Sequence, residues 1–466
     1  MKFVVAIGAA ALTVVSAAVS SAQPQTANAP PTYTKDVAPI LNNRCAGCHR
    51  PGEVAPMSLL SYDEVRPWAR AIRRNVVERV MPPWGAEAGH RKLRNDQSLS
   101  AGEIDTIVRW VDAGVPKGAD TSVVPTPQFT SGWRGGEPDH VFKMPEFEVP
   151  AEGEIPGEYF WVQNPFEEDV WVSRLELWPG NNRVVHHIRM DIVNLPVSEG
   201  YSVVNHRLIG PDGKEVQGEQ GGRSTDHLFL TKDSTFYLIA YVPGNGVQEY
   251  PKGTGKRIKA GQWIRFNLHY QATGRREIDQ SRLGMWFAKT PVTREVYEGT
   301  VGQPLANAST ELKSGRQVTV QGKPVGDAPL PNIPPYVEDW EIIGVTSITE
   351  PVTIYAFWPH MHLRGKSLKW VVTWPDGREE TVLNVPRYDF NWQLNYELET
   401  PLRLPAGSRL TAIARYDNSL KNRFNPAPDQ QVFWSQQSWD EMFSPHMVYT
   451  LDDQNLLGRT TSSQRR

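Results

Sequence analysis

The sequence predicts a multidomain protein in which a small all-α domain precedes a longer all-β region. Between residues 33 and 118, apolar residues recur at helical spacing, as in YDEVRPWARAIRRNVVERV and SAGEIDTIVRWVDAG. After about residue 145, short alternating stretches such as STFYLIAYV and WIRFNLHYQ are separated by turn signals such as PDGK and PAGS. The second pattern is typical of one or two β-sandwiches.

Segments rich in Pro, Gly and Ser mark the expected domain boundaries. Residues 119–145 form a predicted linker, and residues 301–335 form a second one inside the β region. We therefore expect a helical domain over residues 33–118 and two sandwiches over 146–300 and 336–458. Within the helical domain, Ser100 and Glu103 have the spacing of a capping box, and the helix that they begin should stop at Gly114.

The first residues have the layout of a secretory signal peptide. Lys2 precedes an apolar run, and small residues follow as far as Ala22, so residues 1–22 are the expected signal and cleavage is expected after Ala22. The alternative is an uncleaved membrane anchor, which the short, Ala-rich run fits less well. No later stretch is apolar enough to span a bilayer. We expect a periplasmic or secreted protein with no membrane span after cleavage.

Charge and cysteine content narrow the function classes. The net charge of −3 gives no basic surface for nucleic acid. Exported proteins often carry disulfides, but this chain has two cysteines, and both lie in the motif CAGCH. The β region must therefore fold on its apolar core alone.

The motif CAGCH is the attachment signal of a covalent c-type haem. Cys45 and Cys48 would add to the haem vinyl groups, and His49 would bind the iron from one side. The alternatives are a redox CxxC and half of a zinc site. No second cysteine pair exists to complete a zinc site, and the segment does not read as a βαβ unit. We expect one haem c.

A methionine is the expected sixth iron ligand, because a Met/His pair raises the reduction potential and suits electron transfer. Met57 follows His49 too closely to reach the opposite face of the ring easily. Met81 follows a helical pattern and precedes two prolines, so we favour Met81. Either methionine could instead be a packing residue.

Three segments here resemble a known kind of domain. CAGCHRPGEVAPMSLLSY, RPWARAIRRNVVERVMPPW and LSAGEIDTIVRWVDAG are together similar to the small cytochrome c domains that are fused to larger enzymes in bacterial exported proteins. The resemblance covers most of residues 33–118. It implies a cytochrome c domain at this end of the chain.

The β region carries an ordered series of possible metal ligands. His186 and His187 are adjacent, so a straight strand would point them apart unless the backbone bends. His269 lies on the polar face of the strand WIRFNLHYQ, and the period of two places His360 and His362 on one side. Imidazole and thioether donors together suit copper. A lone histidine is more often a surface or core residue than a metal ligand. The ordered series is therefore stronger evidence for metal binding than any single histidine.

The order HH, HY, HxH, DEM resembles the type II, ascorbate-dependent copper monooxygenases, the family of peptidylglycine α-hydroxylating monooxygenase and dopamine β-monooxygenase. The resemblance covers roughly residues 155–450 and implies two jelly-roll-like sandwiches, each holding one copper ion, that face each other across a solvent cleft. By resemblance, the electron-transfer copper would be held by His186, His187 and His269. The O2-activating copper would be held by the catalytic residues His360, His362 and Met442.

The chain departs from that family in three respects. Its β region has no cysteine, Trp358 stands where the peptide hydroxylase has an Arg, and His446 stands where it has a Tyr. Peptidyl-glycine is therefore not the expected substrate, and the aromatic residues Phe357, Trp358 and Trp434 indicate an apolar or aromatic one. His446 is close enough to Met442 in the sequence to contact the metal ligands without binding the metal itself. The remaining histidines, which we expect not to bind metal, are His90, His140, His206 and His227.

The expected function is a haem- and copper-containing monooxygenase that hydroxylates a C–H bond of a small organic substrate with O2. The haem would relay electrons from an external donor, a small reductant or a redox protein, to the copper ions. One alternative is a periplasmic electron-transfer or redox-sensing protein without hydroxylase activity. Another is a carbohydrate- or partner-binding sandwich in which the histidines are incidental.

Overall fold

The structure is a computed structural model that describes residues 29–119, 127–129, 132–153, 155–195, 200–216, 235–305, 317–326, 328–435 and 437–459. The expected signal peptide and His227 lie outside the described residues. Within those ranges, no helix combines the length and the apolar character that a membrane crossing needs.

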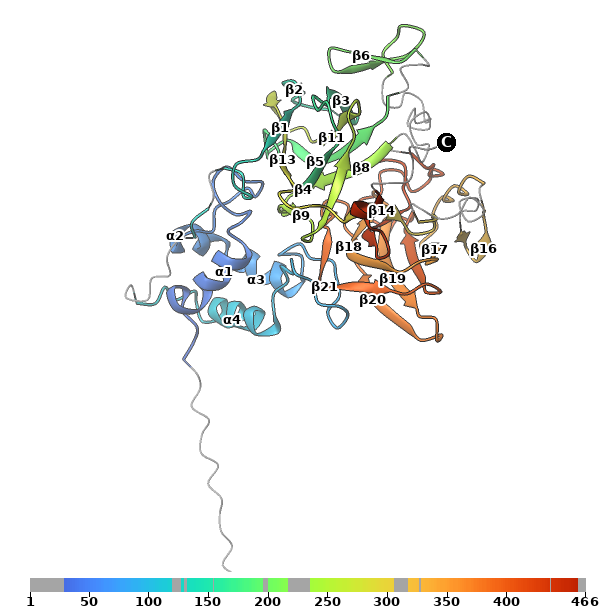
Figure 1. The fold of residues 1–466 in the computed structure, drawn as a ribbon. Helices are drawn as coiled ribbons and strands as arrows, with labels where there is room; N and C mark the ends of the chain where they lie inside the picture. The colour runs from blue at the N-terminus through green and yellow to red at the C-terminus, as the bar shows by residue number, and fades with distance from the viewer. Residues whose placement is uncertain are drawn as a thin grey trace, which may run out of the picture.

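The prediction of a small all-α cytochrome c domain is wrong. Strand is the predominant regular structure of the described residues, and residues 29–119 hold only short helical pieces separated by long irregular stretches (Figure 1). These pieces are η1 (Tyr33–Val37), α1 (Ala38–Arg44), α2 (Tyr62–Val65), η2 (Arg66–Trp68), α3 (Ala69–Val77) and α4 (Ala101–Asp112). They share a small apolar core that includes Leu41, Val65, Ile107 and Trp110.

Two features explain this outcome. Pro67 lies inside the periodic stretch that begins at Tyr62, and because proline has no N–H to donate, the stretch breaks into α2, a 3₁₀ turn and α3. The chain after α3 then leaves the helices and pairs with the β region. The backbone N–H of Arg94 donates to the carbonyl of Glu397, and the N–H of Glu399 donates to that of Lys92. The longest helix, α4, has the predicted capping box between Ser100 and Glu103.

Strands of the β region begin at residue 140. Those of its first half are β1 (His140–Lys143), β2 (Phe147–Val149), β3 (Glu158–Gln163), β4 (Val170–Trp178), β5 (Val185–Val193), β6 (Ser202–Val204), β7 (Arg207–Ile209), β8 (Thr235–Tyr241), β9 (Gln248–Glu249), β10 (Thr254–Ile258), β11 (Trp263–Tyr270), β12 (Glu277–Asp279), β13 (Arg282–Phe287) and β14 (Arg294–Thr300). Those of the second half are β15 (Val318–Val320), β16 (Lys323–Pro324), β17 (Trp340–Ser347), β18 (Val352–His360), β19 (Gly365–Thr373), β20 (Glu379–Val385), β21 (Tyr396–Leu404), β22 (Arg409–Tyr416) and β23 (Ser444–Leu451), before a final turn η6 (Leu456–Arg459).

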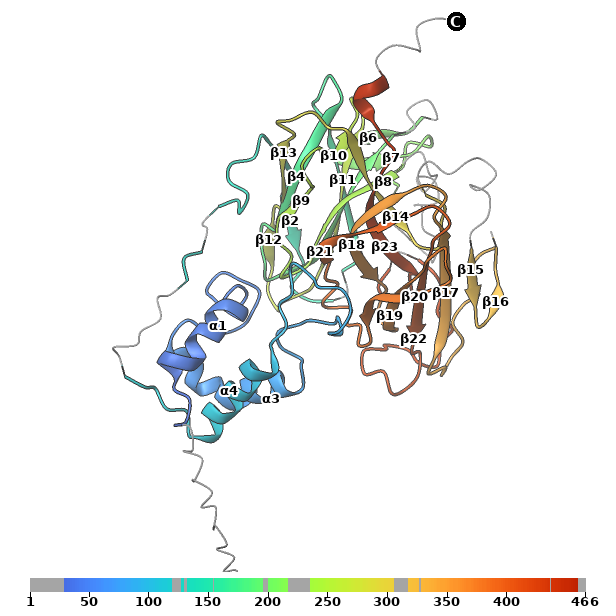
Figure 2. The same cartoon turned by 60° about the horizontal axis from the view of Figure 1, so that its bottom comes forward.

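These strands stack as sandwiches, in agreement with the β part of the predicted fold. The four-stranded sheet β3-β11-β5-β8 and the six-stranded sheet β16-β15-β17-β22-β19-β20 each pack against one large sheet. The large sheet has the order β1-β13-β4-β10-β14-β23-β18-β21, with β9 added on β4. Because β14 pairs with β10 on one side and with β23 on the other, the two halves share a continuous sheet (Figure 2).

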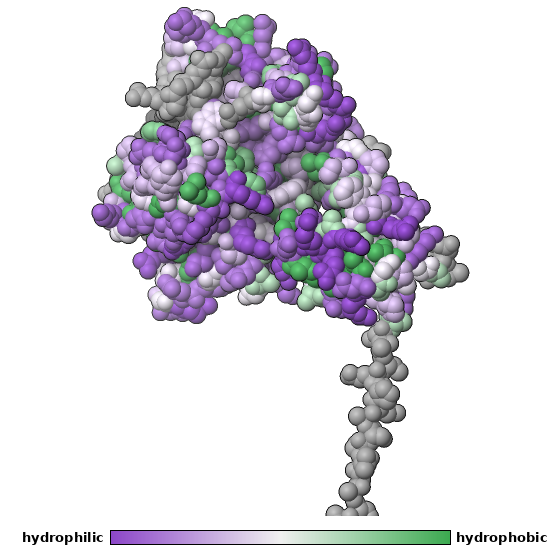
Figure 3. Space-filling view, turned by 180° about the vertical axis from the view of Figure 1, so that it is seen from behind, coloured by the Kyte–Doolittle hydropathy of each residue, from purple (hydrophilic) through white to green (hydrophobic). Residues whose placement is uncertain are grey.

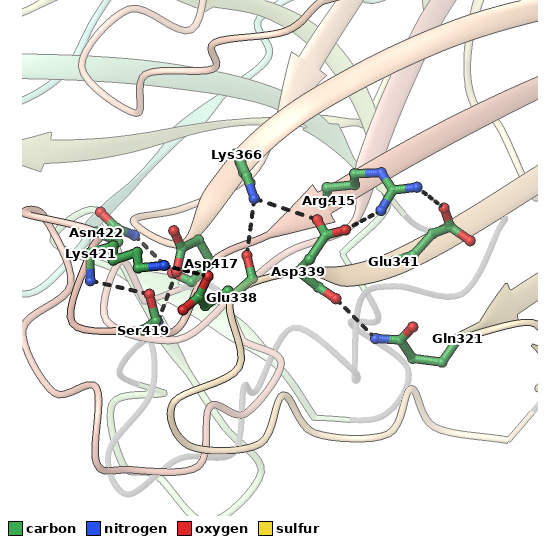
Figure 4. Close-up of polar contacts among 10 residues, drawn as sticks. All are labelled: Gln321, Glu338, Asp339, Glu341, Lys366, Arg415, Asp417, Ser419, Lys421 and Asn422. Carbon is green, nitrogen blue, oxygen red and sulfur yellow. Dashed lines mark hydrogen bonds and ion pairs between the residues drawn. The ribbon is translucent and has the colours of Figure 1, made fainter.

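An exposed network of charges lies beside the paired strands β17 and β22 of the second half (Figure 4). Arg415 on β22 pairs with Asp339 and with Glu341 on the neighbouring strand β17. The ammonium group of Lys366 lies 3.6 Å from Asp339 and donates to the backbone carbonyl of Glu338. Exposed pairs of this kind contribute little each, about 0–1 kcal/mol, so the network mainly fixes the pairing of β17 with β22.

The surface is largely hydrophilic on the face seen in Figure 3, and apolar residues gather over the helical segment. Trp68, Val77 and Val80, which belong to or follow α2–α3, are 43%, 51% and 46% exposed.

Candidate metal centre

The first set of predicted ligands lies on two paired strands of the four-stranded sheet. His269 on β11 is directly opposite His187 on β5, and their rings are 4.3 Å apart. The next pair along the ladder joins Tyr270 to Val185, so His186 is an extra residue in a β-bulge. The bulge supplies the bend that adjacent histidines need, and the Nδ1 atoms of His186 and His187 lie 3.0 Å apart.

The second set lies where β18 ends and β23 begins. His360 is the last residue of β18, His362 follows it, and Met442 precedes β23. The Nε2 of His360 lies 3.3 Å from the sulfur of Met442. A nitrogen and a sulfur bound to one tetrahedral ion at about 2.0 and 2.3 Å would be separated by ~3.5 Å. This pair is therefore spaced as two ligands of one ion.

Hydrogen bonds orient both imidazoles of the second set. The Nδ1–H of His360 donates to the side-chain oxygen of Gln393, and the Nδ1–H of His362 donates to the backbone carbonyl of Asp440 at 3.3 Å. Each Nε2 is then left as the free lone pair, the arrangement that metal-binding histidines use.

Glu441 holds the loops that carry this second set. One carboxylate oxygen accepts the backbone N–H groups of His362 at 2.8 Å and Met442 at 3.2 Å, and the other accepts that of Arg364 at 2.6 Å. Burial raises the pKa of Glu441 to about 7, although these hydrogen bonds oppose the shift. The sequence analysis missed Glu441 and Gln393. In the sequence, Glu441 belongs to the acidic residues before Met442, and Gln393 lies in the polar segment RYDFNWQLNYEL. Both patterns are also typical of turns, so neither one indicates a supporting residue.

The two sets meet around one aromatic ring. Phe390 lies 5.1 Å from the ring of His186 and 5.8 Å from that of His362. A buried cavity of about 20 Å³ is lined by residues of both sets, namely His187, His269, His360 and His362 together with Gln393 and Trp358. This volume holds a water molecule or an ion but no organic molecule. The open cleft implied by the family resemblance is thus not the arrangement found here.

The histidines are in the form that binds metal. Burial lowers the pKa of His269 to about 3 and that of His360 to about 4, and it holds those of His187 and His362 well below the ordinary value. All four imidazoles are therefore neutral at neutral pH, with lone pairs available to a cation.

The arrangement is incomplete as a metal site. Among the described residues, no three His, Cys, Asp or Glu side chains are already arranged around one ion. The donor chemistry nevertheless fits copper, because neutral imidazoles and one thioether converge in a buried space. Gly157 also leaves room for a ligand ring, since a Cβ at this position would lie 2.9 Å from the Nε2 of His269.

The residues of the haem motif lie at the end of α1. Cys45 and Cys48 are free thiols in one turn, and the backbone N–H of His49 donates to the carbonyl of Cys45. Burial raises the pKa of the Cys45 thiol to about 12, whereas redox-active CxxC thiols have lowered values. The thiols therefore do not fit a redox CxxC.

His49 is oriented as an iron ligand would be. Its Nδ1–H donates to the backbone carbonyl of Met57 at 3.2 Å, which leaves Nε2 free. Met57 thus lies on the His49 side and packs in the helical core. Met81 lies half-buried in the loop after α3.

A large cavity begins beside this motif. Its volume is about 920 Å³, within the range of about 300–1,000 Å³ that ligand and cofactor sites occupy. Its lining includes Cys48, Arg50, Tyr241 and Trp358. The two free thiols and the orientation of His49 fit a covalent haem, and Cys48 is the residue of the motif that lines this cavity. Trp358 also lines the small cavity, as do Ala240 and Tyr241, so these three residues border both spaces.

The described histidines that we expected not to bind metal make other contacts. His140 packs against Phe142, His206 donates to the backbone carbonyl of Trp161, and His90 lies 3.3 Å from a carboxylate oxygen of Glu87.

Comparisons with known proteins do not place the chain in a family. No protein-family model and no curated protein matches it. Solved structures that it is similar to include a Paenibacillus xanthan lyase, with 9% identity over 71% of this chain and a TM-score of 0.15. A second is an allantoicase, with 6% identity over 58% of this chain and 81% of the other, and a TM-score of 0.14. A third is the M60 catalytic domain with CBM51 domains of Clostridium perfringens ZmpB, with 9% identity over 68% of this chain and 38% of the other, and a TM-score of 0.13.

The chain spans only 28% of the xanthan lyase. TM-scores this low carry no argument about fold or function. Since none of the three names describes a copper monooxygenase, the family resemblance stays a prediction.

Proposed function

We propose that this protein is a haem- and copper-dependent monooxygenase that hydroxylates a C–H bond of a small organic substrate. The observation that carries the proposal is the convergence of His187, His269, His360 and His362, from separate parts of the sequence, on one buried cavity with Met442 beside it. Copper, when bound, would supply the one-electron chemistry through which O2 attacks a C–H bond. The proposed setting is the periplasm or the exterior of the cell.

Two sets of residues would each bind one copper ion. His186, His187 and His269 would hold the electron-transfer ion, and His360, His362 and Met442 the oxygen-activating ion. The thioether of Met442 favours the reduced state of copper. Gln393 and Asp440 fix the two rings of the second set, so little reorganisation is needed when the metal changes charge.

Cys45 and Cys48 would hold the haem, His49 would bind its iron, and Met81 is the proposed further iron ligand; Cys48 places the motif beside the large cavity. An external reductant or redox protein would supply the electrons. The indole of Trp358 borders both cavities and therefore lies between the large cavity and His360.

The electron-transfer or redox-sensing alternative also has an observation in its favour. The cavity at the histidines, about 20 Å³, has no space for an organic substrate, whereas an ion that only accepts and passes electrons needs none. Hydroxylation requires either that the substrate reaches the centre from the large cavity past Trp358 or that Phe390 moves.

Metal and product analysis of the exported protein tests the proposal. We expect one haem and two copper ions per chain, and O2 consumption that forms a hydroxylated product when a reductant is supplied. Met442→Leu should abolish hydroxylation, leave the haem spectrum unchanged and retain the apolar volume of the side chain, while the control His90→Ala should be active. Copper binding without O2 consumption would support the electron-transfer alternative, and absence of copper would refute both.

A further inference from the structure

A row of three rings connects the histidine centre with the large cavity. The indole of Trp358 on β18 lies 5.3 Å from the ring of His360, and the phenol ring of Tyr237 on β8 lies 5.3 Å from the indole. Single electrons cross steps of this length between aromatic rings readily. The function proposed above gives Tyr237 no role, although its ring extends the contact from the centre by one step.

The surroundings of Trp358 suit an indole that gives up one electron. Its Nε1–H donates to the backbone carbonyl of Gln393 at 2.9 Å. A carbonyl oxygen accepts a hydrogen bond but is too weak a base to take the proton, so an indole that has lost an electron keeps its proton and stays a radical cation. In this form it is a strong enough oxidant to take an electron from a neighbouring phenol.

The charges around the two rings do not oppose this transfer. The ring of His446 stacks on Trp358 at 4.9 Å and on Tyr237 at 6.1 Å, and burial holds the pKa of His446 well below its ordinary value, so this imidazole is neutral. The guanidinium carbon of Arg189 lies 5.8 Å from the ring of Tyr237. Because a phenol that loses an electron also loses its proton, it becomes a neutral radical that this cation does not destabilise.

The outer end of the row meets a space that small molecules can enter. Tyr237 is half-buried and lines the large cavity, whereas the side chain of Trp358 is 6% exposed. The cavity volume of about 920 Å³ is sufficient for a small organic reductant. The small cavity at the histidines, about 20 Å³, excludes such a molecule. A reductant therefore reaches the phenol more easily than it reaches the centre itself.

We propose that Trp358 and Tyr237 carry electrons from a small reductant in the large cavity to the histidine centre, and that the protein thereby reduces hydrogen peroxide. Peroxide forms at such a centre whenever O2 takes up two electrons and two protons without oxidising a substrate. Its reduction would protect the ligands, since a thioether such as that of Met442 is readily oxidised to a sulfoxide. The proposal rests on the proposed function in that peroxide reacts at copper bound by the histidines.

The electrons and protons of this reaction balance. One peroxide takes up two electrons and two protons from water, its O–O bond breaks, and two waters form. Each electron leaves Trp358 and is replaced from Tyr237, whose phenol releases its proton to water in the large cavity. A hydrogen-atom donor, for which hydroquinone is a suitable probe, then returns one electron and one proton to the tyrosyl radical. Two one-electron oxidations of the donor accompany each peroxide.

Electron paramagnetic resonance of rapidly frozen samples tests the row without relying on turnover. Mixing the copper-loaded protein with hydrogen peroxide should give a tyrosyl radical, which hydroquinone should remove. Its hyperfine splitting should collapse in protein labelled with ring-deuterated tyrosine. The signal should be lost in Tyr237→Phe, where the radical stays on the indole, and persist in the control Tyr336→Phe, because Tyr336 is 56% exposed. The labelled wild-type protein answers the question even if Tyr237→Phe fails to fold.

Three results would overturn the proposal. The first is a copper-loaded protein that forms no tyrosyl radical, and the second is a radical that persists in Tyr237→Phe. The third is a radical that persists after a chelator has removed the copper, because it would then arise at the haem motif. Peptide mass spectrometry adds a chemical readout. At equal peroxide, Tyr237→Phe should gain more sulfoxide at Met442 than the wild type and Tyr336→Phe do, and equal oxidation would refute the protective role.

The same measurements separate this proposal from hydroxylation. A tyrosyl radical that behaves as expected in a protein that hydroxylates nothing refutes the proposed monooxygenase and supports peroxide reduction through Trp358 and Tyr237. Hydroxylation in a protein that forms no such radical refutes the row and leaves the monooxygenase standing. A protein that binds no copper refutes both.

Discussion

The indole of Trp358 lies 5.3 Å from the ring of His360 and borders both the small histidine cavity and the large cavity beside Cys48. Its Nε1–H donates to the backbone carbonyl of Gln393 at 2.9 Å, so the indole is fixed to the segment that also orients His360. One buried side chain thereby links the packing of the sandwich to the geometry of the candidate metal centre.

Replacing this indole should be costly. Trp358 is 6% exposed, and truncating a buried Trp to Ala removes its apolar contacts and leaves a cavity, so Trp358→Ala should lower the free energy of unfolding by about 3–5 kcal/mol. Trp439→Ala is the control, because Trp439 is 37% exposed and should cost far less. Urea unfolding of both variants measures the difference. An equal loss of unfolding free energy in both variants would show that Trp358 contributes no more to packing than an exposed Trp.

Glu441 should control metal affinity without touching the metal. In Glu441→Gln, the amide NH2 would face backbone N–H donors, so the loops of His362 and Met442 would lose hydrogen bonds. We expect copper affinity to fall about 10–100-fold, as when supporting groups behind metal ligands are removed. Copper titration against a competing chelator measures this change. The exposed residue Glu249 supplies the control, Glu249→Gln, and unchanged affinity in Glu441→Gln would contradict the positioning role.

The sequence predicted the local features better than the long-range ones. Alternation identified the strands that carry His269 and His360, and the spacing of Ser100 and Glu103 identified the start of α4, because these patterns depend on neighbouring residues. Periodicity overstated the helical domain, since Pro67 breaks the helix and the chain after α3 pairs with strands distant in sequence.

The residues that hydrogen-bond to the candidate metal ligands could not be predicted from local sequence patterns. Gln393 reaches His360 from 33 positions away, and Glu441 reaches His362 from 79. Such contacts exist only after the second sandwich has formed. The bend at His186 was anticipated as a requirement, but its physical form, a bulge opposite Tyr270, comes from the pairing of β5 with β11.

Gly157 should be essential for the first ligand set. In Gly157→Ala, the new Cβ would lie 2.9 Å from the Nε2 of His269, so the ring would have to move from its present position. We expect the variant to bind about one copper ion fewer per chain and to keep its haem spectrum, as measured by metal analysis. Gly102→Ala is the matched control, because nothing lies within 4 Å of a Cβ there and alanine favours the helix α4. Full copper content in Gly157→Ala would argue against His269 as a ligand.

The buried ion cluster on β5 and β11 should govern stability in acid. Asp191 accepts hydrogen bonds from Arg189 at 3.0 Å and Arg265 at 2.9 Å. Burial alone would raise the pKa of Asp191, but the two guanidinium groups outweigh it and hold the pKa below its ordinary value. The unfolded chain therefore binds a proton more readily than the folded one.

It follows that the stabilisation from Asp191 is complete above its ordinary pKa of about 3.9 and is lost as the pH falls through the lower folded value. Asp191→Asn should cost about 3–5 kcal/mol at pH 7, because it leaves the buried guanidinium group of Arg265 and the half-buried one of Arg189 without their counter-charge. Its unfolding free energy should also change less than that of the wild type between pH 5 and pH 2. Urea unfolding across this range measures both effects, with the exposed Asp63→Asn as control. A parallel loss in Asp191→Asn and the wild type would mean that other carboxylates cause the acid unfolding.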